Sequence, residues 1–153
     1  MAVSGLSAGA TMAAVTALRA RDEGGPALRG QVLFYPVTDY PSALPASYQT
    51  YAEGYGLTQD NMLWFWEQYL DSPAAAADPH ASPLRAASMA GLPPACVFVA
   101  ECDVLHDEGM AYGQRLQQAG VATHLQACPG TAHSFLKYAG VLPEVDAVLA
   151  KTY

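Results

Sequence analysis

Basic residues are scarce in this sequence. Only 7 of its 153 residues are Lys or Arg, against 14 Asp and Glu, which gives a net charge of −7 at neutral pH. Nucleic acids and anionic membranes recruit proteins through clustered basic side chains, and the few basic residues here are scattered along the chain. The composition therefore argues against a nucleic acid or an anionic membrane as a partner.

Long apolar runs are also missing. No stretch reaches the roughly 20 apolar residues that a membrane-spanning helix needs. The first residues, Met1 to Gly5, lack the basic region and following apolar segment that are typical of a signal peptide. We therefore expect no membrane span and a cytoplasmic location.

Cysteine is rare. Cys96, Cys102 and Cys128 form an odd set without closely spaced pairs, so a disulfide framework is not expected and a reducing cytoplasm is the simplest setting. Cys102, His106 and His133 are conceivable metal ligands, but they lack the spacing of known zinc motifs. We expect inert, buried thiols, with no metal and no cofactor.

Hydrophobic residues, in contrast, make up 52% of the chain, which is enough for one domain with a buried core. Apolar runs bounded by Gly and Pro predict buried strands, and apolar residues at helical spacing predict helices between them. In chain order we expect a strand at 1–4, a helix at 8–21, a strand at 31–37, a helix at 58–70, a strand at 95–100, a helix at 108–119, a strand at 121–128 and a helix at 143–151.

This alternation is typical of an α/β fold with about four parallel strands and helices on both faces of the sheet. Thr58 and Asp107 are the predicted N-caps of their helices. We expect a single domain over 1–153, interrupted by a long insertion at about 38–94. Long loops in compact domains often form lids or binding segments, so we expect this insertion to contribute to a substrate pocket.

The most informative motif is Gly5-Leu6-Ser7-Ala8-Gly9, which lies where a strand ends and a helix begins. This is the context of a nucleophile elbow, in which a sharp turn exposes a reactive serine. Such a turn needs small neighbours, which Gly5 and Gly9 supply. The start of the helix also favours negative charge, so the N–H of Ala8 is the natural first donor of an oxyanion hole. A tight strand-to-helix turn without catalysis is the alternative for the motif taken alone.

A nucleophilic serine needs a base, and the base needs a carboxylate that orients it. Asp103 follows the predicted strand at 95–100, and His133 follows the strand at 121–128. Because parallel strands end at one edge of a sheet, both should lie near Ser7. The competing acids and bases, which fit this position less well, are Glu101, Asp107, Glu108, His80, His106 and His124.

Several segments together resemble the bacterial family IV esterases of the α/β-hydrolase fold, which are similar to hormone-sensitive lipase. They cover nearly the whole chain in the family's order: 5–9, Tyr35-Pro36, Ser82-Pro83-Leu84, Leu92-Pro93-Pro94, 103–109 and 129–135. The resemblance implies that Ser7 is the nucleophile, Asp103 the acid and His133 the base, and that residues 54–70 help to form the substrate pocket.

The sequence departs from the family pattern in two ways. Leu6 and Ala10 replace a frequent Asp and Gly of the elbow, and Val104 and His106 replace Pro and Arg beside the acid. The H-G-G-G-type run that completes the family's oxyanion hole is also missing from these residues. The chain therefore resembles the C-terminal half of such an enzyme, with an exposed strand edge at 1–4.

The function expected from these features is hydrolysis of a carboxylic ester with a small apolar acyl or aryl group. Leu6, Tyr35, Trp64 and Phe135 are the candidate pocket residues, although aromatics of the insertion could equally belong to the core. Amide hydrolysis by the same triad is a weaker alternative. The other alternative is a catalytically silent half that acts in binding or assembly and needs a complementary N-terminal polypeptide. By resemblance, 121–128 is a candidate homodimer interface.

Overall fold

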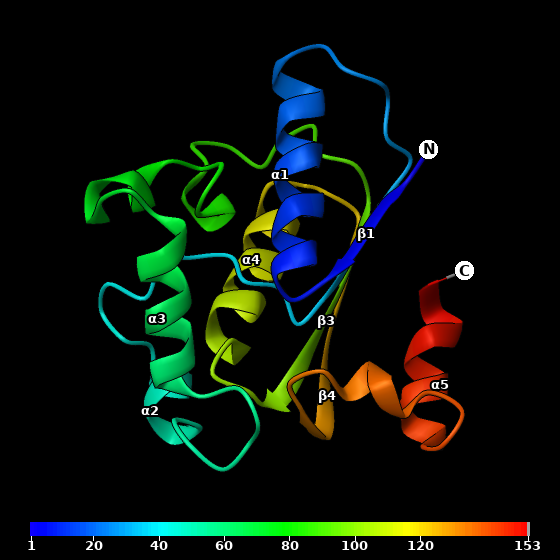
Figure 1. Ribbon diagram of the computed structural model, residues 1–153. Helices are drawn as coiled ribbons and strands as arrows, with labels where there is room; N and C mark the ends of the chain where they lie inside the picture. Colours follow the sequence, from blue (N-terminus) through cyan, green and yellow to red (C-terminus); the bar gives the residue numbers. More distant parts are fainter. Residues whose placement is uncertain (153) are drawn as a thin grey trace.

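The computed structural model describes residues 1–152 and contains one sheet of four parallel strands (Figure 1). The strands lie side by side in chain order: β1 (Val3–Leu6), β2 (Gln31–Phe34), β3 (Ala95–Cys102) and β4 (Thr123–Ala132). The register pairs the last residue of β1 with the last residue of β2, Leu6 with Phe34, and Phe34 with Phe98 of β3. The predicted α/β class and four-stranded parallel sheet are confirmed.

Helices cover both faces of this sheet (Figure 1). On one face, α1 (Ala8–Asp22) and α4 (His106–Gln118) bury their small and apolar side chains against the strands. On the other face, α5 (Pro143–Leu149) contributes Val145 and Val148 to a second apolar cluster. Burial of apolar surface on both faces explains why the strands read as continuous apolar runs.

The insertion between β2 and β3 forms a third apolar cluster against the start of α4. The insertion contains α2 (Ala46–Thr50), α3 (Gln59–Tyr69) and two short 3-10 helices at Pro73–Ala77 and Pro83–Arg85. The predicted cap of α3 is confirmed, because the Thr58 hydroxyl accepts the Asn61 N–H and the Asn61 side chain accepts the Thr58 N–H. Helix α2 was not expected from the sequence, since it is only five residues long.

Several element boundaries differ from the predictions, including β1 at Val3–Leu6 instead of 1–4, and two of the differences have identifiable reasons. Strand β2 ends at Phe34 rather than at residue 37, because Tyr35 has a φ of 37° and leaves the extended conformation. Helix α4 begins at His106 after Leu105, so the prediction that Asp107 caps it is wrong. The Asp107 carboxylate instead accepts the N–H of Ser47 at 2.9 Å and ties α2 to α4.

Differences at the end of the chain are smaller. Strand β4 continues through Pro129 and Gly130 to Ala132 instead of ending at 128. Helix α5 ends at Leu149 and is followed by a 3-10 turn, Ala150–Thr152. None of the helices within residues 1–152 combines the length and the apolar character that crossing a bilayer requires.

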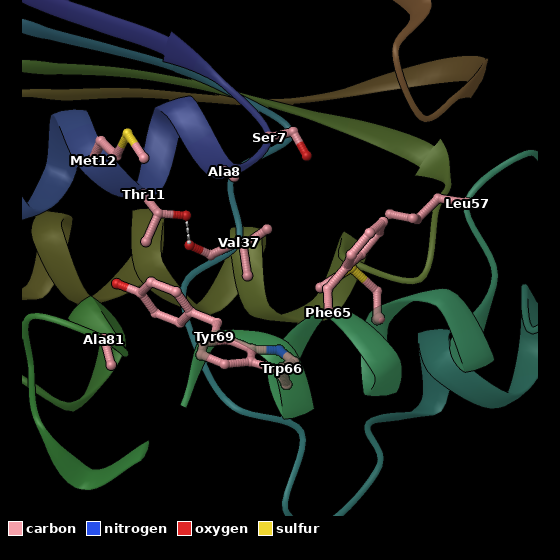
Figure 2. Close-up of a pocket in the computed structure, with 11 residues that line it drawn as sticks. Ser7, Ala8, Thr11, Met12, Val37, Leu57, Phe65, Trp66, Tyr69 and Ala81 are labelled. Carbon is pink, nitrogen blue, oxygen red and sulfur yellow. Dashed lines mark hydrogen bonds between the residues drawn. The ribbon is translucent and has the colours of Figure 1, made fainter. Parts of the chain in front are cut away.

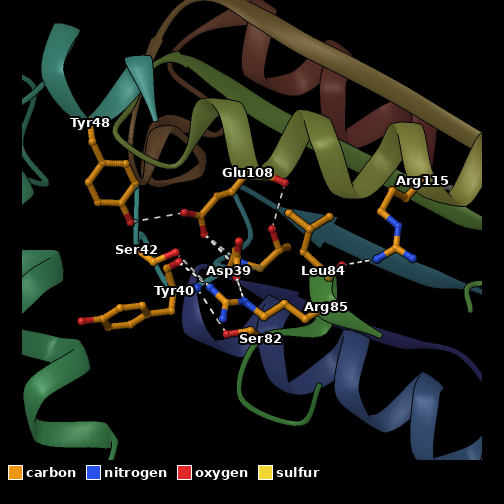
Figure 3. Close-up of polar contacts among 10 residues, drawn as sticks. Asp39, Tyr40, Ser42, Tyr48, Ser82, Leu84, Arg85, Glu108 and Arg115 are labelled. Atoms are coloured by element: carbon orange, nitrogen blue, oxygen red, sulfur yellow. Dashed lines mark hydrogen bonds and ion pairs between the residues drawn. The ribbon is translucent and has the colours of Figure 1, made fainter. Parts of the chain in front are cut away.

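A buried carboxyl group joins the insertion to α4. The side chain of Glu108 accepts the backbone N–H groups of Thr38 at 2.7 Å and Asp39 at 3.4 Å and the hydroxyl of Tyr48 at 3.2 Å (Figure 3). The Thr38 hydroxyl in turn donates to the Glu108 carbonyl. Burial raises the pKa of Glu108 from 4.5 to about 8, although the backbone donors act in the opposite direction.

Two arginines fasten the rest of the insertion in the same region (Figure 3). Arg85 pairs with the Asp39 carboxylate and donates to the Tyr40 carbonyl, while Arg115 of α4 donates to the Leu84 carbonyl. The Arg85 bonds join the two ends of the insertion to each other, and the Arg115 bond joins the second end to α4. The loop segments that flank α2 and α3 are therefore fixed although they lack regular secondary structure.

Glu108→Gln should remove a pH dependence from the stability of the protein. The pKa of Glu108 is about 8 in the folded protein but stays near 4.5 in the unfolded chain. The folded state therefore binds the Glu108 proton more tightly than the unfolded chain does. The contribution of this proton to the free energy of unfolding is complete below pH 4.5 and is lost as the pH rises through 8. Across that range, chemical denaturation should show the wild-type free energy of unfolding falling relative to that of Glu108→Gln.

Glu108→Leu is the matched control, because it removes the acceptor as well as the titrating proton. It leaves buried donors of Thr38 and Tyr48 unpaired, which costs about 1–3 kcal/mol for each group at every pH. Parallel pH curves for the wild type and Glu108→Gln would contradict the assignment of this titration to Glu108.

Candidate active site

Ser7 lies in the turn between β1 and α1 and has an unusual backbone conformation. Its φ is 52° and its ψ is −123°, a combination that residues with a side chain rarely adopt. The Ser7 N–H donates to the Phe34 carbonyl at 3.0 Å, and the Ser7 carbonyl accepts the N–H groups of Ala10 and Thr11. The end of β2 and the first turn of α1 thus hold the strained residue from both sides.

The two glycines of the motif have different roles. A Cβ on Gly5 would lie 2.1 Å from the Gly9 carbonyl oxygen, so β1 and α1 can approach this closely only when residue 5 has no side chain. A Cβ on Gly9 would meet nothing within 4 Å. The structure therefore gives a steric reason for glycine at position 5 alone.

His133 and Asp103 lie beside Ser7, as the order of the strands predicts. His133 Nδ1 is 2.7 Å from Asp103 Oδ2, and His133 Nε2 is 3.0 Å from Ser7 Oγ. A carboxylate can only accept, so Nδ1 donates to Asp103 and Nε2 is free to accept the Ser7 hydroxyl proton. Asp103 is 1% exposed, and its other oxygen accepts the Leu105 N–H at 3.1 Å.

The competing candidates make other contacts. Glu101 accepts the N–H of Gly130, and Glu108 and Asp107 bind the insertion. The remaining histidines also have other neighbours: His80 lies beside Asp78, His106 contacts the Ala100 carbonyl, and His124 contacts Gln126. Within residues 1–152, no group of three or more His, Cys, Asp or Glu side chains could hold a metal ion.

An apolar cavity of about 400 Å³ opens beside Ser7 (Figure 2). The start of α1 forms one side, with Ser7 and Met12, and α3 forms the opposite side with its aromatic rings. The Thr11 hydroxyl lies between them but donates to the Val37 carbonyl at 2.7 Å. The full lining is Ser7, Ala8, Thr11, Met12, Val37, Leu57, Met62, Phe65, Trp66, Tyr69 and Ala81.

None of the four predicted pocket residues lines this cavity. Leu6 and Trp64 are exposed outside it, whereas Tyr35 and Phe135 are buried. Trp64 does not line the cavity, because Met62, Phe65, Trp66 and Tyr69 share one side of α3 by their helical spacing and position 64 lies off that side. The spacing of those four apolar residues in the sequence is the signal that identifies the lining side of α3.

The first turn of α1 adds a donor beside Ser7. Ala8 is the first residue of α1, so its N–H has no acceptor within the helix. The positive end of the helix dipole reinforces this group. Ala8 also lines the cavity, which allows its N–H to meet negative charge that forms near Ser7 Oγ.

Gly5→Ala should destabilise the protein much more than Gly9→Ala. The Gly5 variant forces backbone atoms of β1 and α1 apart, which we expect to cost about 3 kcal/mol, whereas the Gly9 variant has open space for its methyl group. Urea denaturation monitored by circular dichroism measures both. Equal losses in the two variants would contradict the steric role of Gly5.

Comparison with known proteins agrees with this geometry. A profile of the family described as "alpha/beta hydrolase fold" matches residues 1–137. The chain is 42% identical to an ethyl acetate hydrolase of Pseudomonas putida, over 95% of this chain and 46% of that protein. It is 43% identical to the carboxylic ester hydrolase LipN of Mycobacterium tuberculosis, over 89% of this chain and 37% of that protein.

Solved structures give the same result. The crystal structure of a thermostable esterase from Pseudomonas putida ECU1011 superposes with a TM-score of 0.92 at 44% identity, over 98% of this chain and 48% of that one. The chain therefore spans about half the length of the relatives it matches. On its parallel sheet, its Ser7 elbow and these similarities, the chain belongs to the hormone-sensitive-lipase-like family of α/β hydrolases.

Proposed function

We propose that this chain forms the partial catalytic domain of a carboxylic ester hydrolase that acts through Ser7, His133 and Asp103. The observation that carries the proposal is the continuous contact from Asp103 through His133 to Ser7, at 2.7 and 3.0 Å. Relatives that are named ethyl acetate hydrolase and carboxylic ester hydrolase support it.

In the proposed reaction, Ser7 Oγ attacks the ester carbonyl carbon while His133 Nε2 takes the hydroxyl proton. Asp103 stabilises the imidazolium through Nδ1, and the Ala8 N–H donates to the oxyanion. The tetrahedral intermediate collapses to an acyl-serine, and His133 returns the proton to the leaving alcohol. Water then adds to the acyl-serine with His133 as base, which releases the acid and restores Ser7.

The cavity supports substrates with a small apolar acyl or aryl group. Its lining between Ser7 and α3 consists mainly of apolar and aromatic side chains, with no Lys, Arg, Asp or Glu among them. A charged acyl group would lose hydration there without gaining an opposite charge. A volume of about 400 Å³ accommodates a short acyl chain or one ring.

A second proposal, a catalytically silent half that needs a complementary polypeptide, is supported by the length comparison. The chain spans 46% of the ethyl acetate hydrolase, and Ala8 supplies only one oxyanion donor. Loss of one such donor reduces rates about 10²–10³-fold. We also propose a homodimer that forms through 121–128, most of which belongs to the edge strand β4. A cytoplasmic location is likewise proposed.

The proposed triad predicts that Ser7 reacts with a fluorophosphonate and that the chain hydrolyses p-nitrophenyl acetate. Ser7→Ala should abolish labelling, and Asp103→Asn should lower kcat by up to about 10⁴-fold because His133 adopts the wrong tautomer. Intact-protein mass spectrometry measures labelling, and p-nitrophenolate absorbance measures turnover. An unlabelled Ser7 in the folded chain would overturn the esterase proposal, while labelling without turnover would favour the silent half.

The cavity predicts chain-length selectivity that depends on Ala81. Ala81→Leu fills part of the cavity, so kcat/KM for p-nitrophenyl butyrate should fall about 10-fold relative to the acetate. Trp64→Ala is the matched control, because Trp64 is exposed and does not line the cavity. An unchanged butyrate-to-acetate ratio in Ala81→Leu would show that the acyl group binds elsewhere.

A further inference from the structure

Tyr35 holds a position equivalent to those of the three proposed catalytic residues. Each of the four strands is followed directly by one residue of this group: Ser7 after β1, Tyr35 after β2, Asp103 after β3 and His133 after β4. The Tyr35 N–H donates to the Phe98 carbonyl at 2.6 Å and continues the pairing of β2 with β3 for one residue. The proposed mechanism gives Tyr35 no role.

The Tyr35 ring packs against the rings of both His133 and Phe135. Its centroid is 4.9 Å from that of the His133 ring, at an interplanar angle of 63°, and 5.3 Å from that of Phe135, at 70°. Tyr35 is 3% exposed and Phe135 is 2% exposed. The ring on which His133 packs is therefore itself in contact with a second buried ring.

Backbone strain is concentrated at the same place. Within residues 1–152, four residues other than glycine have a positive φ, and three of them are Ser7, Tyr35 and Ser134. Ser134, at a φ of 63°, directly follows His133. Such conformations persist only where surrounding contacts fix them, and they are often found at functional sites. The turn at Tyr35 also breaks an apolar run that would otherwise continue as a strand.

We propose that Tyr35 is a positioning residue for His133, an inference that rests on the proposed function. Asp103 and Ser7 hold the two nitrogens of the imidazole, but two contacts alone do not prevent the ring from rotating about the line through its nitrogens, which would turn the Nε2 lone pair away from Ser7 Oγ. The Tyr35 ring contacts the imidazole from the side and blocks that rotation. It keeps Nε2 directed at Ser7 Oγ while the proton moves.

Tyr35→Met tests this role, because Met fills a similar volume without a flat ring. Displacement of the imidazole should lower the rate constant for fluorophosphonate labelling of Ser7 about 10–100-fold. For p-nitrophenyl acetate the loss should appear in kcat with KM unchanged. Tyr35→Phe keeps the ring and should retain the wild-type rate. If Tyr35→Met does not fold, Tyr35→Leu replaces it with the same expectations.

Phe98→Leu is the matched control for a purely structural role. Phe98 is fully buried in the same cluster, where it stacks on Phe34 at 5.2 Å. This variant should lose stability but keep the wild-type labelling rate. A wild-type labelling rate in folded Tyr35→Met, or an equal loss in Phe98→Leu, would overturn the proposal.

A second measurement separates this inference from the proposed function. The proton that His133 Nδ1 donates to Asp103 gives a low-field NMR signal, which reports ring position without requiring any reaction. The signal should broaden or shift in Tyr35→Met and stay unchanged in Tyr35→Phe. A wild type that is not labelled at all would reject the esterase proposal. An unchanged NMR signal in Tyr35→Met would reject the positioning role of Tyr35, whatever the labelling result.

Discussion

The parallel pairing of four strands in chain order is the constraint on which the rest of the structure depends. Parallel strands deliver their carboxyl ends to one edge of the sheet. The residues that directly follow the strands, Ser7, Tyr35, Asp103 and His133, therefore meet although they are up to 126 positions apart. A slip of one residue in any strand would turn the following side chain away from this edge. The buried faces under α1, α4 and α5 oppose such a slip.

The insertion depends on the same sheet through α4. Glu108 lies in the first turn of α4, and its carboxyl group binds the backbone of Thr38 and Asp39 directly after Val37. Val37 lines the cavity and accepts the hydroxyl of Thr11. Burial of an acid is unfavourable, which the raised pKa of Glu108 expresses. Leaving the loop N–H groups unpaired in the interior would also be costly. The carboxyl group of Glu108 provides the acceptor that this loop beside the cavity lacks, because the loop forms no regular secondary structure.

The sequence predicts the features that depend on local residue patterns, but it does not predict the features that tertiary packing determines. The strands, the Thr58 cap and the order of Ser7, Asp103 and His133 follow from apolar periodicity and turn residues. The choice of Trp66 over Trp64 also follows from local pattern, because only Trp66 shares the helical spacing of Met62, Phe65 and Tyr69. The predicted strand at 31–37 is too long because Tyr35 has a positive φ, which an apolar run does not indicate, and because Pro36 has no N–H with which to continue the pairing.

The strained residues explain how a small site can be rigid. An unfavourable φ at Ser7 or Tyr35 costs of the order of 1–3 kcal/mol, so each would relax if its contacts were loose. At Ser7, the bond to Phe34 and the close approach of Gly5 to Gly9 prevent relaxation. At Tyr35, the bond to Phe98 and the ring of Phe135 do so. The supports from Phe34 and Phe98 come from strands β2 and β3, and those from Gly9 and Phe135 come from the helical segments that closely follow β1 and β4. The sheet therefore fixes not only which residues meet but also the conformations in which the proposed proton transfer takes place.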